Sequence, residues 1–166
     1  SAMTLSTLDD MLAIEAIRQL KAAYCRLVDT KQWQRLEMLF AADAKMEGFG
    51  SVPDGSGPSV FIAGVAERIG ASVSLHHVHA PEILLSSPET ARCVWPMMDY
   101  VEFPAGSTPT GERGWIGWGF YEEEYACIDG EWCITFMRLT RQRMDALSAD
   151  HPALKAGRIA PTPNWM

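Results

Sequence analysis

The chain has 166 residues and a formal net charge of −7, with 48% hydrophobic and 21% charged residues. This composition predicts one globular domain with a full hydrophobic core and excludes a disordered chain. The acidic balance, without any basic run, gives no support for nucleic acid or an anionic membrane as a partner.

The two ends of the chain are set apart from the domain. The opening Ser-Ala-Met is typical of an expression-tag remnant, so residues 1–3 are excluded and the domain is expected at 4–145. The start lacks the basic end and apolar core of a signal peptide, and no apolar run approaches the roughly 20 residues of a membrane helix. Residues 146–166 are interpreted as a tail that packs over a cavity mouth, with Trp165 as a plug.

Cysteine usage indicates the compartment. The four cysteines form no CxxC motif, and three of them lie in apolar, strand-like runs. This pattern favours buried free thiols over a disulfide framework. A cytoplasmic location is therefore expected.

Helical patterns fill the first part of the chain. Thr7 is a candidate N-cap, and apolar residues recur at spacings of three and four from Met11 to Val28. A second short helix, a short strand, a loop rich in Gly, Pro and Ser, and a third helix are then expected at residues 29–44, 45–49, 50–59 and 60–73.

Strand patterns follow from residue 74 onward. Residues 74–85 and 90–103 form one pair of long strands with a turn between them. Residues 114–128 and 131–144 form a second pair, joined by Asp-Gly, the strongest short signal for a β-hairpin. Helices followed by antiparallel strands predict an α+β fold, with the helices on one face of a curved sheet that encloses a cavity.

Strand alternation suggests that Asp99 points into this cavity. Its side of the strand carries no other charge and includes Trp95 and Met97. A carboxylate on an apolar face is costly unless it is paired or has a function. The alternative is a strand-end carboxylate that reaches water.

Three of the four histidines lie within positions 76–79. Alternation places His77 and His79 on the more apolar side of their strand and His76 on the opposite side with Glu82. A bulge near Pro81 would invalidate this assignment. Two inward histidines beside an inward Asp99 indicate a site rather than satisfied core residues.

Other kinds of site are disfavoured. A metal would need a third ligand beside two histidines, and only Asp29 or Asp99 could supply it. There is no GxSxG motif, no cysteine in an activating context and no glycine pattern that would cradle a phosphate. We therefore expect acid–base chemistry without a metal or cofactor.

Tyr24 and Asp29 lie at the end of the first helix. Five residues correspond to about 140° around an ideal helix, so the two side chains do not share one face. Asp29 could still fold back toward the cavity where the chain turns. The alternatives are a core tyrosine and an N-cap for the next helix.

The segment "IRQLKAAYCRLVDTKQWQRLEMLFAADA" resembles the opening of the SnoaL-like branch of the NTF2-like superfamily, with its aromatic-x4-Asp pattern, its Trp and its "LF–DA" close. The segments "HHVHAPEI", "ARCVWPMMDYV" and "YEEEYACIDGEWCITFMRLTR" continue the resemblance over about residues 8–145. It implies a cone-shaped α+β barrel. It does not imply one function, because this fold hosts several chemistries.

Within that branch the chain resembles bile acid 7α-dehydratase-like proteins and, more distantly, scytalone dehydratase. Tyr24, Asp29, His77 and Asp99 match the functional residues of the former in type and order, and His79 competes with His77 for the histidine. The resemblance implies cofactor-independent dehydration of a hydroxylated, carbonyl-bearing polycyclic compound such as a steroid or polyketide.

In this hypothesis each matched residue has a role. His77 is the base, oriented by Asp29; Tyr24 donates a hydrogen bond to the leaving hydroxyl or the carbonyl oxygen; Asp99 tunes the imidazole or acts as a second base. A double-bond isomerase and a non-catalytic binder of hydrophobic ligands remain open as alternatives. The resemblance also implies a homodimer or homotrimer. The candidate apolar walls of the substrate site are Trp95, Met97, Trp118 and Phe120.

Overall fold

The computed structural model describes residues 7–153, 159–162 and 165–166. The predicted tag remnant, residues 1–3, lies outside the described residues. The helices and strands are α1 (Leu8–Asp29), α2 (Trp33–Glu37), β1 (Phe40–Glu47), α3 (Pro58–Ile69), β2 (Val73–Val78), β3 (Glu82–Ser87), β4 (Thr90–Glu102), β5 (Gly114–Ile128) and β6 (Glu131–Ala146).

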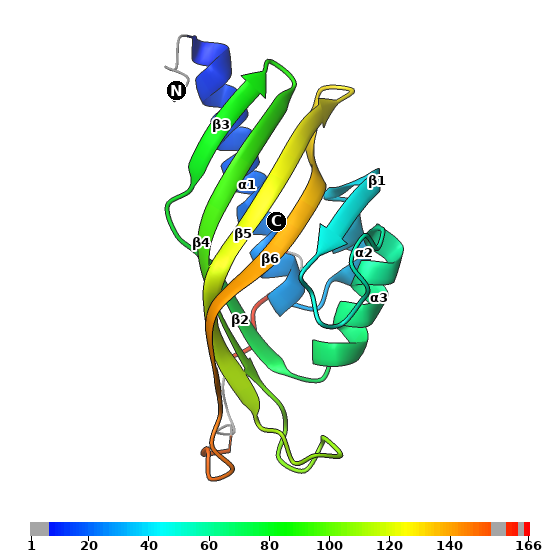
Figure 1. Cartoon of the computed structure of the whole chain (residues 1–166), viewed down its shortest axis with the longest axis vertical. Coiled ribbons are helices and arrows are strands. Elements are labelled where there is room, and N and C mark those ends of the chain that lie inside the picture. Colours follow the sequence, from blue (N-terminus) through cyan, green and yellow to red (C-terminus); the bar gives the residue numbers. More distant parts are fainter. Residues whose placement is uncertain (1–6, 154–158, 163–164) are drawn as a thin grey trace.

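The strands form a six-stranded, mostly antiparallel sheet in the order β1-β6-β5-β4-β2, with β3 also paired to β4. Among the described strands, only the β1–β6 pair is parallel. The sheet curves and twists strongly; α1 runs behind it, and α2 and α3 lie to one side next to β1 (Figure 1). The predicted α+β architecture, helices on a curved sheet, is confirmed.

The first helix begins and ends as its sequence suggests. Thr7 Oγ1 accepts a hydrogen bond from the Asp10 backbone N–H (3.1 Å), and the Asp10 carboxylate accepts one from the Thr7 N–H (3.0 Å). This reciprocal capping box satisfies two donors that the helix would otherwise leave unpaired. Residues Ile17, Leu20, Tyr24 and Val28 are buried along its inner side, as the spacing predicts.

Three predicted boundaries are wrong. The second helix is only five residues long, and the chain from Phe40 enters β1, because it pairs with β6 and Ile134 N–H donates to the Leu39 carbonyl (2.9 Å). The third helix ends at Ile69, before β2 begins. The first long strand is in fact two strands, β2 and β3, interrupted at residues 79–81.

The predicted β5–β6 hairpin is confirmed. Its turn residues Asp129 and Gly130 have φ angles of 53° and 83°, both in the left-handed region. Two successive positive φ values are the requirement of a type I′ turn, which matches the twist of the flanking strands.

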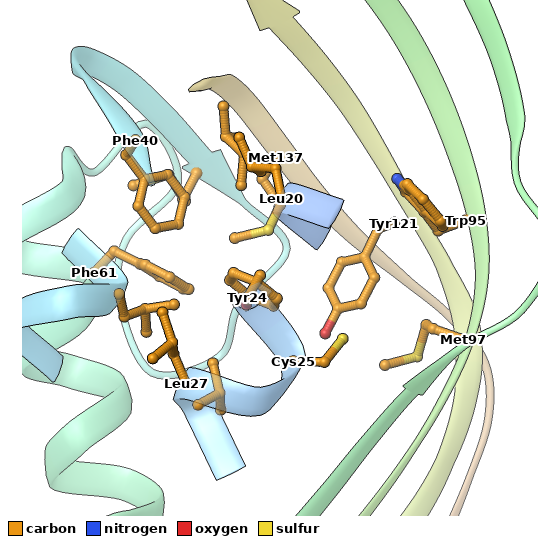
Figure 2. Packing of buried hydrophobic residues seen from close by; sticks show 14 of the residues in the cluster. Leu20, Tyr24, Cys25, Leu27, Phe40, Phe61, Trp95, Met97, Tyr121 and Met137 are labelled. Carbon is orange, nitrogen blue, oxygen red and sulfur yellow. The ribbon is translucent and has the colours of Figure 1, made fainter. Parts of the chain in front are cut away.

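A single core fills the space between α1 and the sheet. Figure 2 shows aromatic and sulfur-containing side chains from α1, β1, α3 and the central strands meeting there. No helix among the residues that the structure describes has the length and apolar character needed to span a membrane.

Candidate active site

His76 is the histidine of β2 that faces the protein interior. Its side chain is 9% exposed, whereas His77 and His79 are exposed. The prediction that His77 and His79 face inward and His76 outward is therefore wrong. The inner side of β2 is polar, with Ser74 buried beside His76, and the outer side carries the exposed Leu75. The more apolar side of this strand is therefore the outer one, which is why its apolar character predicts the wrong face.

The break between β2 and β3 is a second reason why alternation predicts the wrong orientation for the histidines. On β3 the inward residues Ile83 and Leu85 have odd numbers, whereas those of β2 have even numbers. The alternation therefore changes phase across residues 79–81, near the proline where a bulge was expected to matter.

Asp29 holds His76 through both backbone and side chain. Asp29 Oδ1 lies 2.6 Å from His76 Nδ1, and Asp29 Oδ2 accepts a hydrogen bond from the His76 backbone N–H (2.7 Å). The Ser74 hydroxyl also donates to Asp29 Oδ1 (2.9 Å). A carboxylate on Nδ1 favours the tautomer that carries its proton there, which leaves Nε2 as the acceptor.

Asp29 reaches this position because it is the last residue of α1 and that helix ends beside the sheet edge. β2 is an edge strand, and the Asp29 carboxylate satisfies one of its outward N–H groups. Asp29 therefore lies against β2, where its carboxylate contacts Ser74 and His76; that it faces a substrate cavity stays a prediction. The alternative role of Asp29 as the N-cap of α2 is wrong, because Gln32 occupies that position.

Asp99 lies on the inner face, as predicted, but its carboxylate is already paired. Its side chain is 4% exposed and accepts two hydrogen bonds from Arg141, at 2.7 Å and 2.6 Å, and a longer one from Trp115 Nε1 at 3.4 Å. The bidentate guanidinium pair occupies both oxygens of the carboxylate. This geometry does not fit the predicted role of Asp99 as a second base.

Strand register brings the two charged pairs together. His76 is paired with Asp99, and Asp99 with Gly117, across three neighbouring strands. Adjacent strands are about 4.8 Å apart, so the imidazole and the Asp99–Arg141 pair are neighbours along one row of the sheet. Gly117 makes this row possible, because a Cβ there would lie 2.2 Å from Arg141 Nη1 and 2.5 Å from Asp99 Oδ1.

Tyr24, Trp95 and Met97 are buried on the inner side, as predicted. Tyr24 packs edge-on against Tyr121, with ring centroids 6.0 Å apart, and burial raises its pKa well above 10.0, so the hydroxyl stays protonated. In Figure 2 Tyr121 projects from β5 between α1 and the sheet, its hydroxyl directed toward Cys25, with Met97 and Trp95 on the sheet side.

Trp118 and Phe120 do not line this side. The buried residues of β5 are those with odd numbers, including Trp115 and Tyr121, and Trp118 is 36% exposed on the opposite face. The prediction that Trp118 and Phe120 form apolar walls is wrong. Both faces of β5 carry aromatic residues, and the inner face has glycine where Arg141 and Asp99 need space.

A second buried polar cluster was not predicted. The side chains of Lys21 and Glu123 are both fully buried and form an ion pair, and Tyr125 donates to the same carboxylate. The Lys21 ammonium also lies 3.6 Å from the centre of the Tyr121 ring. The only sequence signal was a lysine within the apolar stripe of α1 and an inward-phase glutamate on β5.

Among the described residues, no three His, Cys, Asp or Glu side chains are grouped so that they could hold a metal ion. A groove of about 440 Å³ lies between α1 and the turn after β2, and His79 and Trp95 line it. Asp29 and His76 are not part of that groove.

The C-terminal residues return to the helices. The Arg35 guanidinium donates to the Met166 carbonyl oxygen (2.8 Å). The Trp165 side chain is 84% exposed, so it does not act as the expected plug. That the tail covers the site stays a prediction.

Comparison with known proteins identifies the family. A family model described as "SnoaL-like domain" matches residues 9–138. The chain belongs to the SnoaL-like domain family. The narrower resemblance to bile acid 7α-dehydratase-like proteins stays a prediction.

Solved structures with a fold similar to that of this SnoaL-like protein include a putative dehydratase and two dehydrochlorinases. A putative scytalone dehydratase from Novosphingobium aromaticivorans is 18% identical with a TM-score of 0.72, and the match covers 92% of this chain and 98% of that one. A type 2 hexachlorocyclohexane dehydrochlorinase is also 18% identical, with a TM-score of 0.77 and coverage of 91% and 99%. The type 3 enzyme from Novosphingobium barchaimii has 18% identity, a TM-score of 0.73 and coverage of 90% and 100%. These similarities establish the shared fold.

Proposed function

We propose that this SnoaL-like protein is a cofactor-independent dehydratase that removes water from a hydroxylated, carbonyl-bearing polycyclic compound, such as a steroid or polyketide. The observation that carries the proposal is the Asp29–His76 pair, with 2.6 Å between Oδ1 and Nδ1 and a partly buried imidazole. In such a pair the carboxylate orients the imidazole, the side chain that most often serves as a general base.

Elimination needs a base on one side of the substrate and stabilisation of negative charge on the other. His76 Nε2 takes a proton from the carbon next to the carbonyl, and Asp29 stabilises the imidazolium that forms. Arg141 reaches from β6 to Asp99, the residue opposite His76 on β4. Two of its N–H groups bind Asp99, and further N–H groups can serve the carbonyl or leaving oxygen. Asp99 therefore holds the guanidinium in place instead of acting as a base.

Tyr24 remains the proposed hydrogen-bond donor to the leaving hydroxyl. Its buried hydroxyl keeps its proton because its pKa is raised well above 10.0. The proton that His76 gains can then return to the departing oxygen as water leaves, so no proton is lost from the site. Trp95 and Met97 supply apolar surface on the same face of β4.

Similar structures support the elimination class. Their names, a scytalone dehydratase and a hexachlorocyclohexane dehydrochlorinase, describe the loss of water and of hydrogen chloride from small molecules. Both reactions need a base that removes a proton from carbon and a group that helps an electronegative atom to leave. In the proposed mechanism His76 is that base, and Tyr24 and Arg141 help the leaving atom.

The test is incubation of the protein with a panel of hydroxysteroids and polycyclic hydroxyketones, followed by mass spectrometry. We expect at least one compound to lose the mass of one water. Formation of a conjugated enone without a change in mass would instead show an isomerase. Ligand-induced thermal stabilisation without any product would show a binding protein, and either result would refute the dehydratase.

A further inference from the structure

The turn after α1 places an unusual residue next to the Asp29–His76 pair. The Gln32 N–H donates to the Leu27 carbonyl (2.9 Å) and the Lys31 N–H to the Val28 carbonyl (3.1 Å). These two bonds form a Schellman motif, whose left-handed position is usually a glycine. Here it is Lys31, with φ of 59°.

A lysine in the left-handed region costs stability that glycine would not. Such strain is kept where the side chain has a task. The Lys31 ammonium donates to Ser74 Oγ (2.7 Å), and Ser74 in turn donates to Asp29 Oδ1 (2.9 Å). The lysine is thus joined to the carboxylate through one hydroxyl.

We propose that Lys31 is a positioning residue of the catalytic pair: through Ser74 it holds Asp29 toward His76, and its positive charge disfavours a second positive charge on the imidazole. The inference rests on the proposed function only in calling His76 the base. The charged groups around His76 are Asp29, which contacts its ring, Asp99, which lies opposite it on β4 and whose charge Arg141 balances, and Lys31, which is joined to Asp29 through Ser74.

The ionisation of Lys31 agrees with this placement. Burial lowers the pKa of Lys31 from 10.5 to about 8, although the nearby Asp29 carboxylate opposes the shift. A partly buried ammonium therefore acts on the pair at neutral pH and loses its charge under mildly alkaline conditions. The basic side of the pH–rate profile is expected to report this loss.

The direct test is NMR titration of the His76 imidazole, which needs no substrate. Lys31→Gln removes the charge but keeps a donor for Ser74, so the His76 pKa should rise by about 0.5 to 1 unit. Lys31→Arg keeps the charge and should leave the pKa near that of the wild type. An unchanged His76 pKa in Lys31→Gln would overturn the inference.

Lys31→Gly separates this role from a structural one. Glycine relieves the left-handed strain, so the midpoint of urea unfolding should not fall, while the His76 pKa still rises. Asp129→Gly is the matched control, because Asp129 has a similar φ of 53° in the distant hairpin turn. It should leave the His76 pKa unchanged. A fall in stability of Lys31→Gly with no change in the His76 pKa would mean that Lys31 is only structural.

Kinetics with any compound that turns over adds a second readout. The acid limb of the kcat/KM profile of Lys31→Gln should move to higher pH by the same amount as the His76 pKa, and an unmoved limb would overturn the inference. If no compound reacts while the NMR shift is present, the dehydratase proposal fails and the coupling of Lys31 to His76 stands.

Discussion

At the residue scale, the orientation of one imidazole depends on contacts that are not adjacent in the chain. Asp29 binds the His76 ring and its backbone N–H at the same time, and Ser74 completes the set. Because Asp29 binds both the backbone N–H and the ring Nδ1 of His76, it fixes the rotation of the ring as well as its tautomer. Lys31 extends this chain of contacts toward the protein surface.

The lowered pKa of Lys31 predicts a pH dependence of stability. In the unfolded chain this lysine keeps its proton up to about its ordinary pKa of 10.5, whereas in the folded protein it releases the proton near 8. Between these two values the unfolded state binds more protons, so this residue's contribution to the free energy of unfolding increases with pH. In urea unfolding from pH 7.5 to 10.5, the wild type should gain stability relative to Lys31→Gln. A difference in the free energy of unfolding that does not change with pH would contradict the lowered pKa of Lys31.

At the element scale, the row of paired residues His76, Asp99 and Gly117 across β2, β4 and β5 depends on its glycine. In Gly117→Ala the new Cβ would meet Arg141 and Asp99 at 2.2 Å and 2.5 Å, so the ion pair must move. We expect the catalytic efficiency to fall about 10-fold or more, and the free energy of unfolding to fall by about 1–3 kcal/mol from overpacking.

Gly50→Ala is the control for Gly117→Ala, because a Cβ at position 50 meets nothing within 4 Å. Stability and activity of this control should match those of the wild type. A Gly117→Ala protein with unchanged kinetics and stability would show that the Asp99–Arg141 pair does not need its present position.

Strand elements also show where reasoning from the sequence succeeds. The apolar side of β4 correctly predicted that Trp95, Met97 and Asp99 face inward, because the inner face there is apolar apart from one carboxylate. On β2 the same reasoning failed for His76, because the site itself makes the inner face polar. On β5 the expectation that Trp118 and Phe120 are apolar walls is wrong, because aromatic residues occupy both faces.

Long-range pairing is what the sequence leaves open. Arg141 lies in a run rich in arginine. Only the fold shows that it pairs with Gly119 of β5 and that its side chain passes Gly117 to reach Asp99. The capping box of α1 and the Asp-Gly hairpin were predictable because their signals lie within a few residues. The Lys21–Glu123 pair joins positions 102 residues apart.

At the scale of the whole molecule, the buried Lys21–Glu123 pair links α1 to the centre of the sheet. Both side chains are fully buried, so removal of one partner leaves an uncompensated charge in the core. We expect Lys21→Met to lower the free energy of unfolding by about 3–5 kcal/mol, measured by urea denaturation at neutral pH.

The Arg92–Glu124 pair offers a matched control for that measurement, because both side chains are exposed at the surface. Arg92→Ala should change the free energy of unfolding by about 0–1 kcal/mol. Combining Lys21→Met with Glu123→Leu should recover most of the loss, since no charge is then left unpaired. A loss below about 1 kcal/mol in Lys21→Met would contradict the proposed link between α1 and the sheet.

The expected homodimer or homotrimer stays a prediction.

The central claim is that His76 alone among the three neighbouring histidines is the base. The most direct measurement compares kcat/KM of His76→Ala, His77→Ala and His79→Ala on a compound that the wild type dehydrates. We expect His76→Ala to lose about 10² to 10⁴-fold, as for a positioned general base, while His77→Ala and His79→Ala stay within about 3-fold of the wild type. A His76→Ala protein with wild-type kcat/KM, or a comparable loss in His77→Ala, would contradict the claim.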